Sequence, residues 1–186
     1  MKNIILIDNN DSFTFNLVQT FENCGVDVSV IPESDVFDYD INSFSAIVLS
    51  PGPGLPSDFY NMQRVISEYH NIKPFLGVCL GHQALSEYFG SKLFRLPLIR
   101  HGIRSDLQIL NTHLYAGLTE PVSVGRYHSW AIETPAECLE ITSITEDGII
   151  MSFKHKQLPI SGIQYHPESI ITTQGTKIIE NWLNSF

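Results

Sequence analysis

Short apolar runs alternate with amphipathic stretches along most of the chain. The runs Ile4–Ile7, Ala46–Leu49 and Phe75–Val78 are continuous, which is typical of strands buried on both faces of a sheet. Two further strands are predicted over Val26–Ile31 and Ile160–Gln164. Apolar residues at helical spacing predict helices over four segments: Asp11–Asn23, Asp58–His70, Leu80–Phe89 and Thr173–Leu183.

The alternation of strand and helix predicts an α/β fold, an open and mostly parallel sheet with helices on both faces. Residues 91–152 carry shorter alternating runs, for which we expect a small antiparallel element at one end of the sheet. No linker, repeat or low-complexity tract interrupts the chain, so residues 1–186 are expected to form a single domain. Ligands of such sheets bind beyond the carboxyl ends of the strands, where Pro51–Gly54 and Cys79 fall.

Charge and composition exclude several classes of partner. The 186 residues include 20 acidic and 11 basic side chains, a net charge of −9, without a basic stripe. We therefore expect no nucleic-acid partner and no binding to an anionic membrane surface. The first apolar run is too short for a signal peptide, and no stretch approaches a membrane span. The three cysteines form no Cys-x-x-Cys pair, so a reducing cytoplasm is the expected location.

The segment Gly77–Gly81, with the sequence Gly-Val-Cys-Leu-Gly, has the form of a nucleophile elbow. It lies at a predicted junction between strand and helix, where Cys79 would sit on a tight turn and the glycines would avoid clashes. The amides at the start of the following helix would favour the thiolate of Cys79. The alternative is an inert cysteine packed between two glycines.

Two other patterns supply what such a nucleophile needs. His166 and Glu168 lie two residues apart after a predicted strand, so both can face the same side as a base and its orienting acceptor. Pro51–Gly54 contains glycines that can expose backbone amides toward an oxyanion. Taken separately, the first pattern is also that of an ordinary surface loop, and the second that of a plain turn.

Together these motifs resemble the class I, triad-type glutamine amidotransferases over essentially the full length of the chain. The resemblance is greatest to the small subunit of anthranilate synthase and of aminodeoxychorismate (para-aminobenzoate) synthase. The opening Asp-Asn-x-Asp-Ser-Phe-Thr block indicates this chorismate-using subgroup. Five matching stretches carry the resemblance: Asp8–Leu17, Leu49–Ser57, Gly77–Ala84, Gly125–Ser129 and Gln164–Ser169.

The resemblance implies a flavodoxin-like fold and a role for each matching residue. Cys79 would attack the side-chain amide of glutamine, His166 would move the proton, and Glu168 would orient His166. The remaining residues implied are those of the oxyanion hole and the substrate pocket: backbone amides of Gly52 and Leu80, the Pro51–Gly54 turn with Pro53 and Gly54, Gln83, and the Ser129–Trp130 backbone.

The ammonia released must be kept from bulk water, which implies a sheltered path to a second protein. By resemblance this partner is a large chorismate-binding subunit, and magnesium is expected only there. We assign no metal or other cofactor to this chain, because His101, His113 and His128 are not at metal-ligand spacing. These three histidines are expected to be polar surface or loop residues.

Some positions depart from the pattern of the family. Ile103 follows His101–Gly102 where relatives usually carry Lys, Trp130 replaces a more usual Leu, and Leu93–Leu98 is more apolar than usual. These changes concern the substrate rim and the docking face. Two alternatives remain open: a stand-alone γ-glutamyl hydrolase or cysteine peptidase, and a catalytically silent regulatory subunit.

Overall fold

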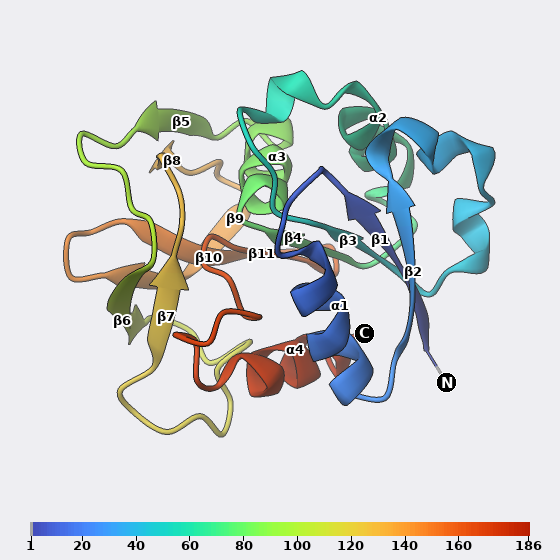
Figure 1. The fold of residues 1–186 in the computed structure, drawn as a ribbon. Coiled ribbons are helices and arrows are strands. Elements are labelled where there is room, and N and C mark those ends of the chain that lie inside the picture. Colours follow the sequence, from blue (N-terminus) through green and yellow to red (C-terminus); the bar gives the residue numbers. More distant parts are fainter. Residues whose placement is uncertain (1) are drawn as a thin grey trace.

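The computed structural model describes residues 2–186, and its centre is a parallel sheet of five strands in the order β2-β1-β3-β4-β11 (Figure 1). The strands fall where the apolar runs predict them: β1 Asn3–Asp8, β2 Asp27–Pro32, β3 Ala46–Leu49, β4 Phe75–Val78 and β11 Ile160–Ile163. Neighbouring strands in this part are all paired in parallel. The prediction of a parallel α/β sheet is therefore confirmed.

The second half of the chain supplies antiparallel strands, as expected for residues 91–152. Four of them continue the sheet beyond β11, in the order β10-β9-β6-β7: β10 Ile150–His155, β9 Leu139–Thr145, β6 Ile103–Ile109 and β7 Ser123–Arg126. A separate antiparallel pair joins β5 Lys92–Arg95 to β8 Trp130–Thr134. Both antiparallel parts lie on the side of the molecule away from β2 (Figure 1).

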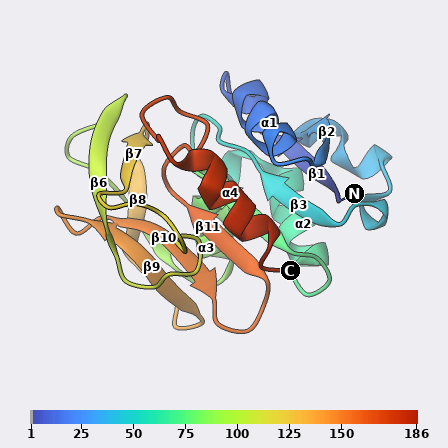
Figure 2. The same cartoon turned by 90° about the horizontal axis from the view of Figure 1, so that it is seen from below.

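Helices cover both faces of the parallel part. The helices are α1 Thr14–Asn23, α2 Tyr60–Tyr69, α3 Leu80–Tyr88 and α4 Gly175–Leu183, with short 3₁₀ segments at Glu33–Asp38, Ile41–Ser43 and Pro56–Asp58. Seen from below, α1 and α4 lie side by side across one face (Figure 2), while α2 and α3 lie across the other. Within residues 2–186, no helix is long and apolar enough to cross a membrane.

Helices α1, α2 and α4 begin two or three residues later than their periodicity predicts, and local side-chain hydrogen bonds accompany the first two of these shifts. The pattern predicts helix α1 from Asp11, but the Asp11 side chain accepts a hydrogen bond from the backbone N–H of Phe13 (2.8 Å) and holds a turn ahead of the helix. It predicts helix α2 from Asp58, where a 3₁₀ turn ends and the carboxylate accepts from the N–H of Leu55 (2.9 Å). Local side-chain hydrogen bonds thus compete with the first helical turn in both places.

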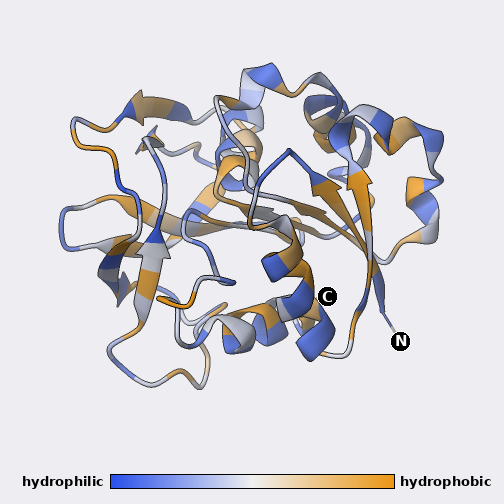
Figure 3. Ribbon diagram, viewed as in Figure 1, coloured by the Kyte–Doolittle hydropathy of each residue, from blue (hydrophilic) through white to orange (hydrophobic). Residues whose placement is uncertain are grey.

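Two apolar clusters form the core, one on each face of the sheet. Along β1, Ile4 and Leu6 pack with the cluster of α1 and α4, while Ile5 and Ile7 pack with that of α2 and α3. Each fully buried side chain of this size contributes about 1.5–3 kcal/mol. The central strands are accordingly apolar, and polar residues lie on the outer surfaces of the helices (Figure 3). This rigid double-sided core places the carboxyl ends of β1, β3, β4 and β11 along one edge.

Candidate active site

Cys79 lies on a strained turn between β4 and α3. Its φ is +52° and ψ is −98°, a conformation that residues with a side chain rarely adopt. The turn is held by the N–H of Cys79, which donates to the carbonyl of Ile163 (2.8 Å), and by its carbonyl, which accepts from the N–H of Gln83 (3.1 Å). The backbone is therefore fixed by both the neighbouring strand and the following helix.

The two glycines of the elbow are sterically required. A Cβ on Gly81 would lie 2.5 Å from the Cβ of Leu49 on β3 and closer still to the carbonyl oxygen of that residue. A Cβ on Gly77 would overlap the backbone of Gly81. Strand and helix can approach this closely only without side chains at both positions. The tight turn between strand and helix that the sequence predicts at Gly77–Gly81 is present, with Cys79 at its strained position.

His166 and Glu168 follow β11 and form a buried hydrogen-bonded pair. The imidazole Nδ1 lies 2.6 Å from Oε1 of Glu168, and both side chains are almost fully buried. Burial alone would lower the pKa of His166, but Cys79 and Glu168 raise it well above its ordinary value of 6.5. Among the described residues, none forms a hydrogen bond of standard geometry with the buried Nε2. That nitrogen is available on the side of Cys79.

The loop that carries this pair is tied to the rest of the fold. The N–H of His166 donates to the carbonyl of Gly125 (3.1 Å), and the hydroxyl of Thr172 donates to the carbonyl of His166 (2.7 Å). At the start of α4, a Cβ on Gly175 would overlap the carbonyl group of Pro167. The sequence interpretation missed Gly175, which has no recognisable motif and follows only from this close contact.

Two aromatic rings cover His166. The ring of Tyr127 lies 5.0 Å from the imidazole centroid and that of Phe13 lies 5.9 Å away, both in edge-on arrangements. The hydroxyl of Tyr127 is 3.0 Å from Oγ of Ser169, which fixes the ring. Both aromatic residues belong to motif stretches, but Phe13 precedes α1 and Tyr127 follows β7, so only the tertiary structure brings them together over His166. They help to shield the imidazole of His166 from water.

A cavity of about 150 Å³ opens beside the sulfur of Cys79. Its walls contain every residue that the resemblance implies for the substrate except Pro51 and Leu80, and in addition Tyr127 and His128: Gly52, Pro53, Gly54, Cys79, Gln83, Tyr127, His128, Ser129 and Trp130. Leu80 begins α3 and is buried, and a Cβ on Gly52 would lie 2.6 Å from its side chain. The two residues expected to form the oxyanion hole are thus neighbours at the edge of this cavity.

The turn after β3 is supported by Asn9, at the end of β1. The side-chain amide of Asn9 donates to the carbonyl of Ser50 (2.9 Å), and its backbone N–H donates to Oγ of the same serine (2.9 Å). A Cβ on Gly52 would lie 2.8 Å from the Cβ of Asn9, so glycine is needed for this close contact. Asn9, which belongs to the opening motif of the chain, therefore helps to hold the Pro51–Gly54 turn in place.

Gln83 and Gln164 connect the sulfur with the far wall of the cavity. The Nε2 of Gln83 donates to the carbonyl of Trp130 (2.9 Å) and to Oε1 of Gln164 (3.0 Å). The Nε2 of Gln164 in turn donates to Sγ of Cys79 (3.6 Å). Sequence reasoning gave Gln164 no role of its own, although it opens the histidine motif.

His128 lies in the loop between β7 and β8, as expected for a loop residue, but it is buried and not at the surface. Its Nδ1 donates to the carbonyl of Trp130 (2.8 Å), and its Nε2 accepts from Nε of Arg126 (3.1 Å). Both nitrogens are satisfied inside the protein, so burial is tolerated. Burial and the nearby positive charge of Arg126 lower the pKa of His128 to about 4, which keeps it neutral. Of the other two histidines, His101 is exposed and His113 is half-buried.

Comparison with known proteins agrees with this geometry. The family model described as glutamine amidotransferase class-I matches residues 5–186. Aminodeoxychorismate synthase component 2 of Klebsiella aerogenes is 40% identical over 97% of this chain and 99% of its own length. Anthranilate synthase component 2 of Pseudomonas aeruginosa is also 40% identical, over 97% of this chain and 94% of its own. A Thermoplasma acidophilum structure described as a GMP synthase subunit shares the fold, with a TM-score of 0.89 at 22% identity over 100% of this chain and 94% of its own.

Proposed function

The chain belongs to the class I glutamine amidotransferases, and on that premise we propose that it uses Cys79, His166 and Glu168 to release ammonia for a chorismate-using synthase. The observation that carries the assignment of residues is the hydrogen-bonded pair of His166 and Glu168 buried beside a strained Cys79 that opens into a small cavity. Nucleophile, base and orienting acceptor are the components of covalent acyl transfer.

The reaction begins with attack of the Cys79 sulfur on the side-chain amide carbon of glutamine. The backbone amides of Gly52 and Leu80 stabilise the negative charge that develops on the amide oxygen. His166 then donates its proton to the leaving nitrogen, so ammonia departs and a thioester remains. Water activated by His166 hydrolyses the thioester to glutamate and regenerates the sulfur.

The amino-acid end of glutamine lies along Gln83 and the Ser129–Trp130 backbone in this proposal. The Trp130 carbonyl already accepts from Gln83 and His128, so this segment binds substrate through its other backbone groups. The cavity of about 150 Å³ is smaller than the roughly 300–1,000 Å³ of pockets for drug-sized ligands. Its size favours a single amino acid over the γ-glutamyl peptides that a stand-alone hydrolase would accept.

The acceptor of the ammonia lies on a partner, the large chorismate-binding subunit of anthranilate synthase or aminodeoxychorismate synthase. Relatives from both synthases are 40% identical to this chain, so overall similarity does not favour one acceptor. Magnesium belongs to the partner's reaction in this proposal, and this chain holds no metal or other cofactor. The complex would work in the cytoplasm, where all three cysteines stay free thiols.

The test compares wild type with Cys79→Ala, each combined with a purified large subunit of either synthase. We expect Cys79→Ala to lower glutamine-dependent product formation by roughly 10⁴-fold or more, because the nucleophile is lost. Ammonia-dependent product should remain, since the partner's site is intact. Cys24→Ser, at a half-buried thiol on the C-terminal side of α1, serves as the matched control. Full glutaminase activity of Cys79→Ala would refute the assignment, and product identification decides the acceptor.

A further inference from the structure

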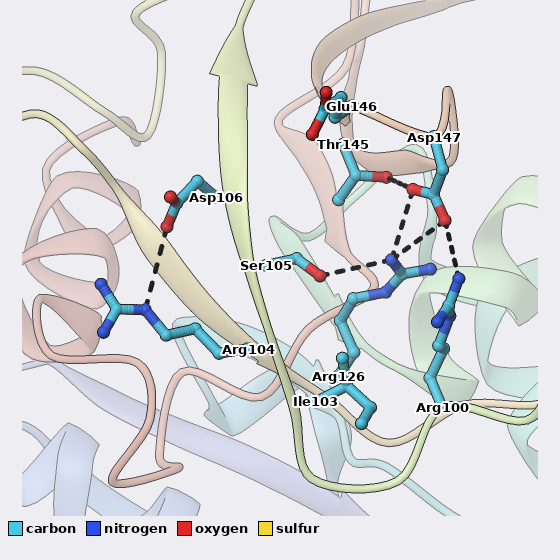
Figure 4. Close-up of a pocket in the computed structure, with 9 residues that line it drawn as sticks. All are labelled: Arg100, Ile103, Arg104, Ser105, Asp106, Arg126, Thr145, Glu146 and Asp147. Carbon is cyan, nitrogen blue, oxygen red and sulfur yellow. Dashed lines mark hydrogen bonds and ion pairs between the residues drawn. The ribbon is translucent and has the colours of Figure 1, made fainter.

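A larger cavity lies on the other side of the hydrogen bond between Arg126 and His128. Its volume is about 480 Å³, and it is lined by residues of β6, β7 and the turn after β9 (Figure 4). Three of the chain's five arginines line it, Arg100, Arg104 and Arg126, although the chain as a whole has a net charge of −9. The glutaminase reaction proposed above uses none of these three.

Two of the arginines share a single carboxylate. The Nη1 of Arg126 lies 3.4 Å from Oδ1 of Asp147, and Nη2 of Arg100 lies 3.0 Å from Oδ2 of the same residue. Figure 4 shows the two guanidinium groups side by side against Asp147. One negative charge therefore faces two positive charges, which leaves an excess of about one positive charge at this point.

Donor groups of both arginines also lack acceptors. The side chain of Arg126 is only 2% exposed, yet no residue in the range 2–186 accepts from its Nη2. The Nε of Arg100 is likewise buried without an acceptor among these residues. Buried donors of a charged group are costly to leave unpaired. The site is thus built for one more acceptor that carries negative charge.

The other carboxylates at the cavity do not supply it. Asp106 pairs at 3.9 Å with Arg104 in an exposed position and accepts from the hydroxyl of Ser123. Glu146 is exposed, and Figure 4 shows its carboxylate directed away from the two guanidinium groups.

Exposed apolar side chains border the same region. Leu98 is 64% exposed, Ile99 is 56% exposed, and Ile103, which lines the cavity, is 41% exposed. Leu98 also lines a neighbouring hollow together with Arg100 and Asp147. Arginine beside exposed apolar residues is typical of protein–protein interfaces. A small anion would leave these apolar side chains in water.

We propose that this face docks onto the large synthase subunit, and that an Asp or Glu side chain of the partner enters the cavity. Its carboxylate accepts hydrogen bonds from Nη2 of Arg126 and Nε of Arg100, while Leu98, Ile99 and Ile103 pack against apolar residues around it. The inference rests on the proposed function, which supplies the partner. It adds that a carboxylate of the partner binds Arg100 and Arg126. Because Arg126 is hydrogen-bonded to His128, which lines the cavity beside Cys79, this contact lies next to the proposed glutamine site.

The test measures binding of this chain to the purified large subunit by surface plasmon resonance. Arg100→Gln should weaken the complex by about 30-fold or more, mainly through faster dissociation, because the partner's carboxylate loses a buried donor. Leu98→Ser, an exposed position where folding is not at risk, should weaken it several-fold. Arg64→Gln is the matched control, since Arg64 is exposed on α2 and pairs with Glu68. A dissociation constant of Arg100→Gln within threefold of wild type would overturn the proposal.

A second arm separates the partner's carboxylate from a free anion. Inorganic phosphate is titrated into the isolated chain by calorimetry, with wild type and Arg100→Gln compared. Binding of phosphate in the micromolar range, lost in Arg100→Gln, together with unchanged partner affinity, identifies a small-anion site and rejects the docking contact. Wild-type chain that binds no large subunit and hydrolyses no glutamine refutes the proposed function instead. Normal complex formation and turnover, unaffected by either variant, refutes only the contact.

Discussion

Replacing Gly81 by alanine tests whether the close approach of α3 to β3 positions the nucleophile. The new Cβ would lie 2.5 Å from the Cβ of Leu49, whereas ordinary contacts begin near 3.4 Å, so the backbone must separate by about 0.9 Å. The N-terminal turn of α3 carries Cys79 and Leu80, and both would move with it.

The expected cost falls on catalysis more than on folding. A displacement of about 1 Å at reacting groups lowers rates by roughly 100-fold, which corresponds to about 2.7 kcal/mol of activation free energy. Overpacking of this kind costs about 1–3 kcal/mol of stability, and each kcal/mol lowers Tm by about 2–4 °C in a chain of this size. We therefore expect a folded Gly81→Ala protein with kcat reduced by about 100-fold.

Steady-state glutaminase kinetics of the complex with the large subunit give kcat, and thermal melts give stability. Gly25→Ala is the matched control: its φ of +75° strains alanine by about 1 kcal/mol, but nothing lies within 4 Å of the added Cβ. This control should lose a similar amount of stability and keep its kcat. The reasoning is wrong if folded Gly81→Ala keeps kcat within threefold of wild type.

Three further predictions concern charges and hydrogen bonds at the site. Glu168→Gln should lower the pKa of His166, cut kcat by about 10²–10⁴-fold and move the alkaline limb of the pH–rate profile to lower pH; an unmoved limb would contradict the pairing. Burial lowers the folded-state pKa of His128 to about 4 and that of His82, which is fully buried on α3, to about 3, both below the ordinary 6.5; the stability that these two histidines contribute is therefore fully present above pH 6.5 and is lost as the pH falls toward 4. Two protons bound on unfolding give a slope of about 2.7 kcal/mol per pH unit, and urea unfolding at several pH values that shows no slope would refute it. Gln83→Leu removes an amide donor from the cavity wall and should raise KM for glutamine by about tenfold or more, measured with kcat in the same assay; an unchanged KM would exclude Gln83 from substrate binding.

Local patterns in the sequence determined the parallel half of the fold and the elbow. The continuous apolar runs could be placed because a strand buried on both faces is recognised from its own residues, without knowing which strands lie beside it. The elbow could be placed because Gly77 and Gly81 lie within two residues of Cys79. Both glycines avoid the close contacts that form wherever a strand turns directly into a helix. The pairing of His166 with Glu168 was accessible for the same reason, since two residues separated by one proline share their local geometry.

The tertiary structure alone decided which distant side chains complete the site. The antiparallel strands bring Tyr127 against Phe13 and His166, and they place His128 in the cavity wall with Gln83 of α3; short alternating runs do not specify such pairings. The burial of His128 follows from Arg126, whose own environment depends on the turn at Asp147. Chain composition gives a net charge of −9, yet the fold gathers arginines around one carboxylate, because charge density on a surface is set by which strands become neighbours.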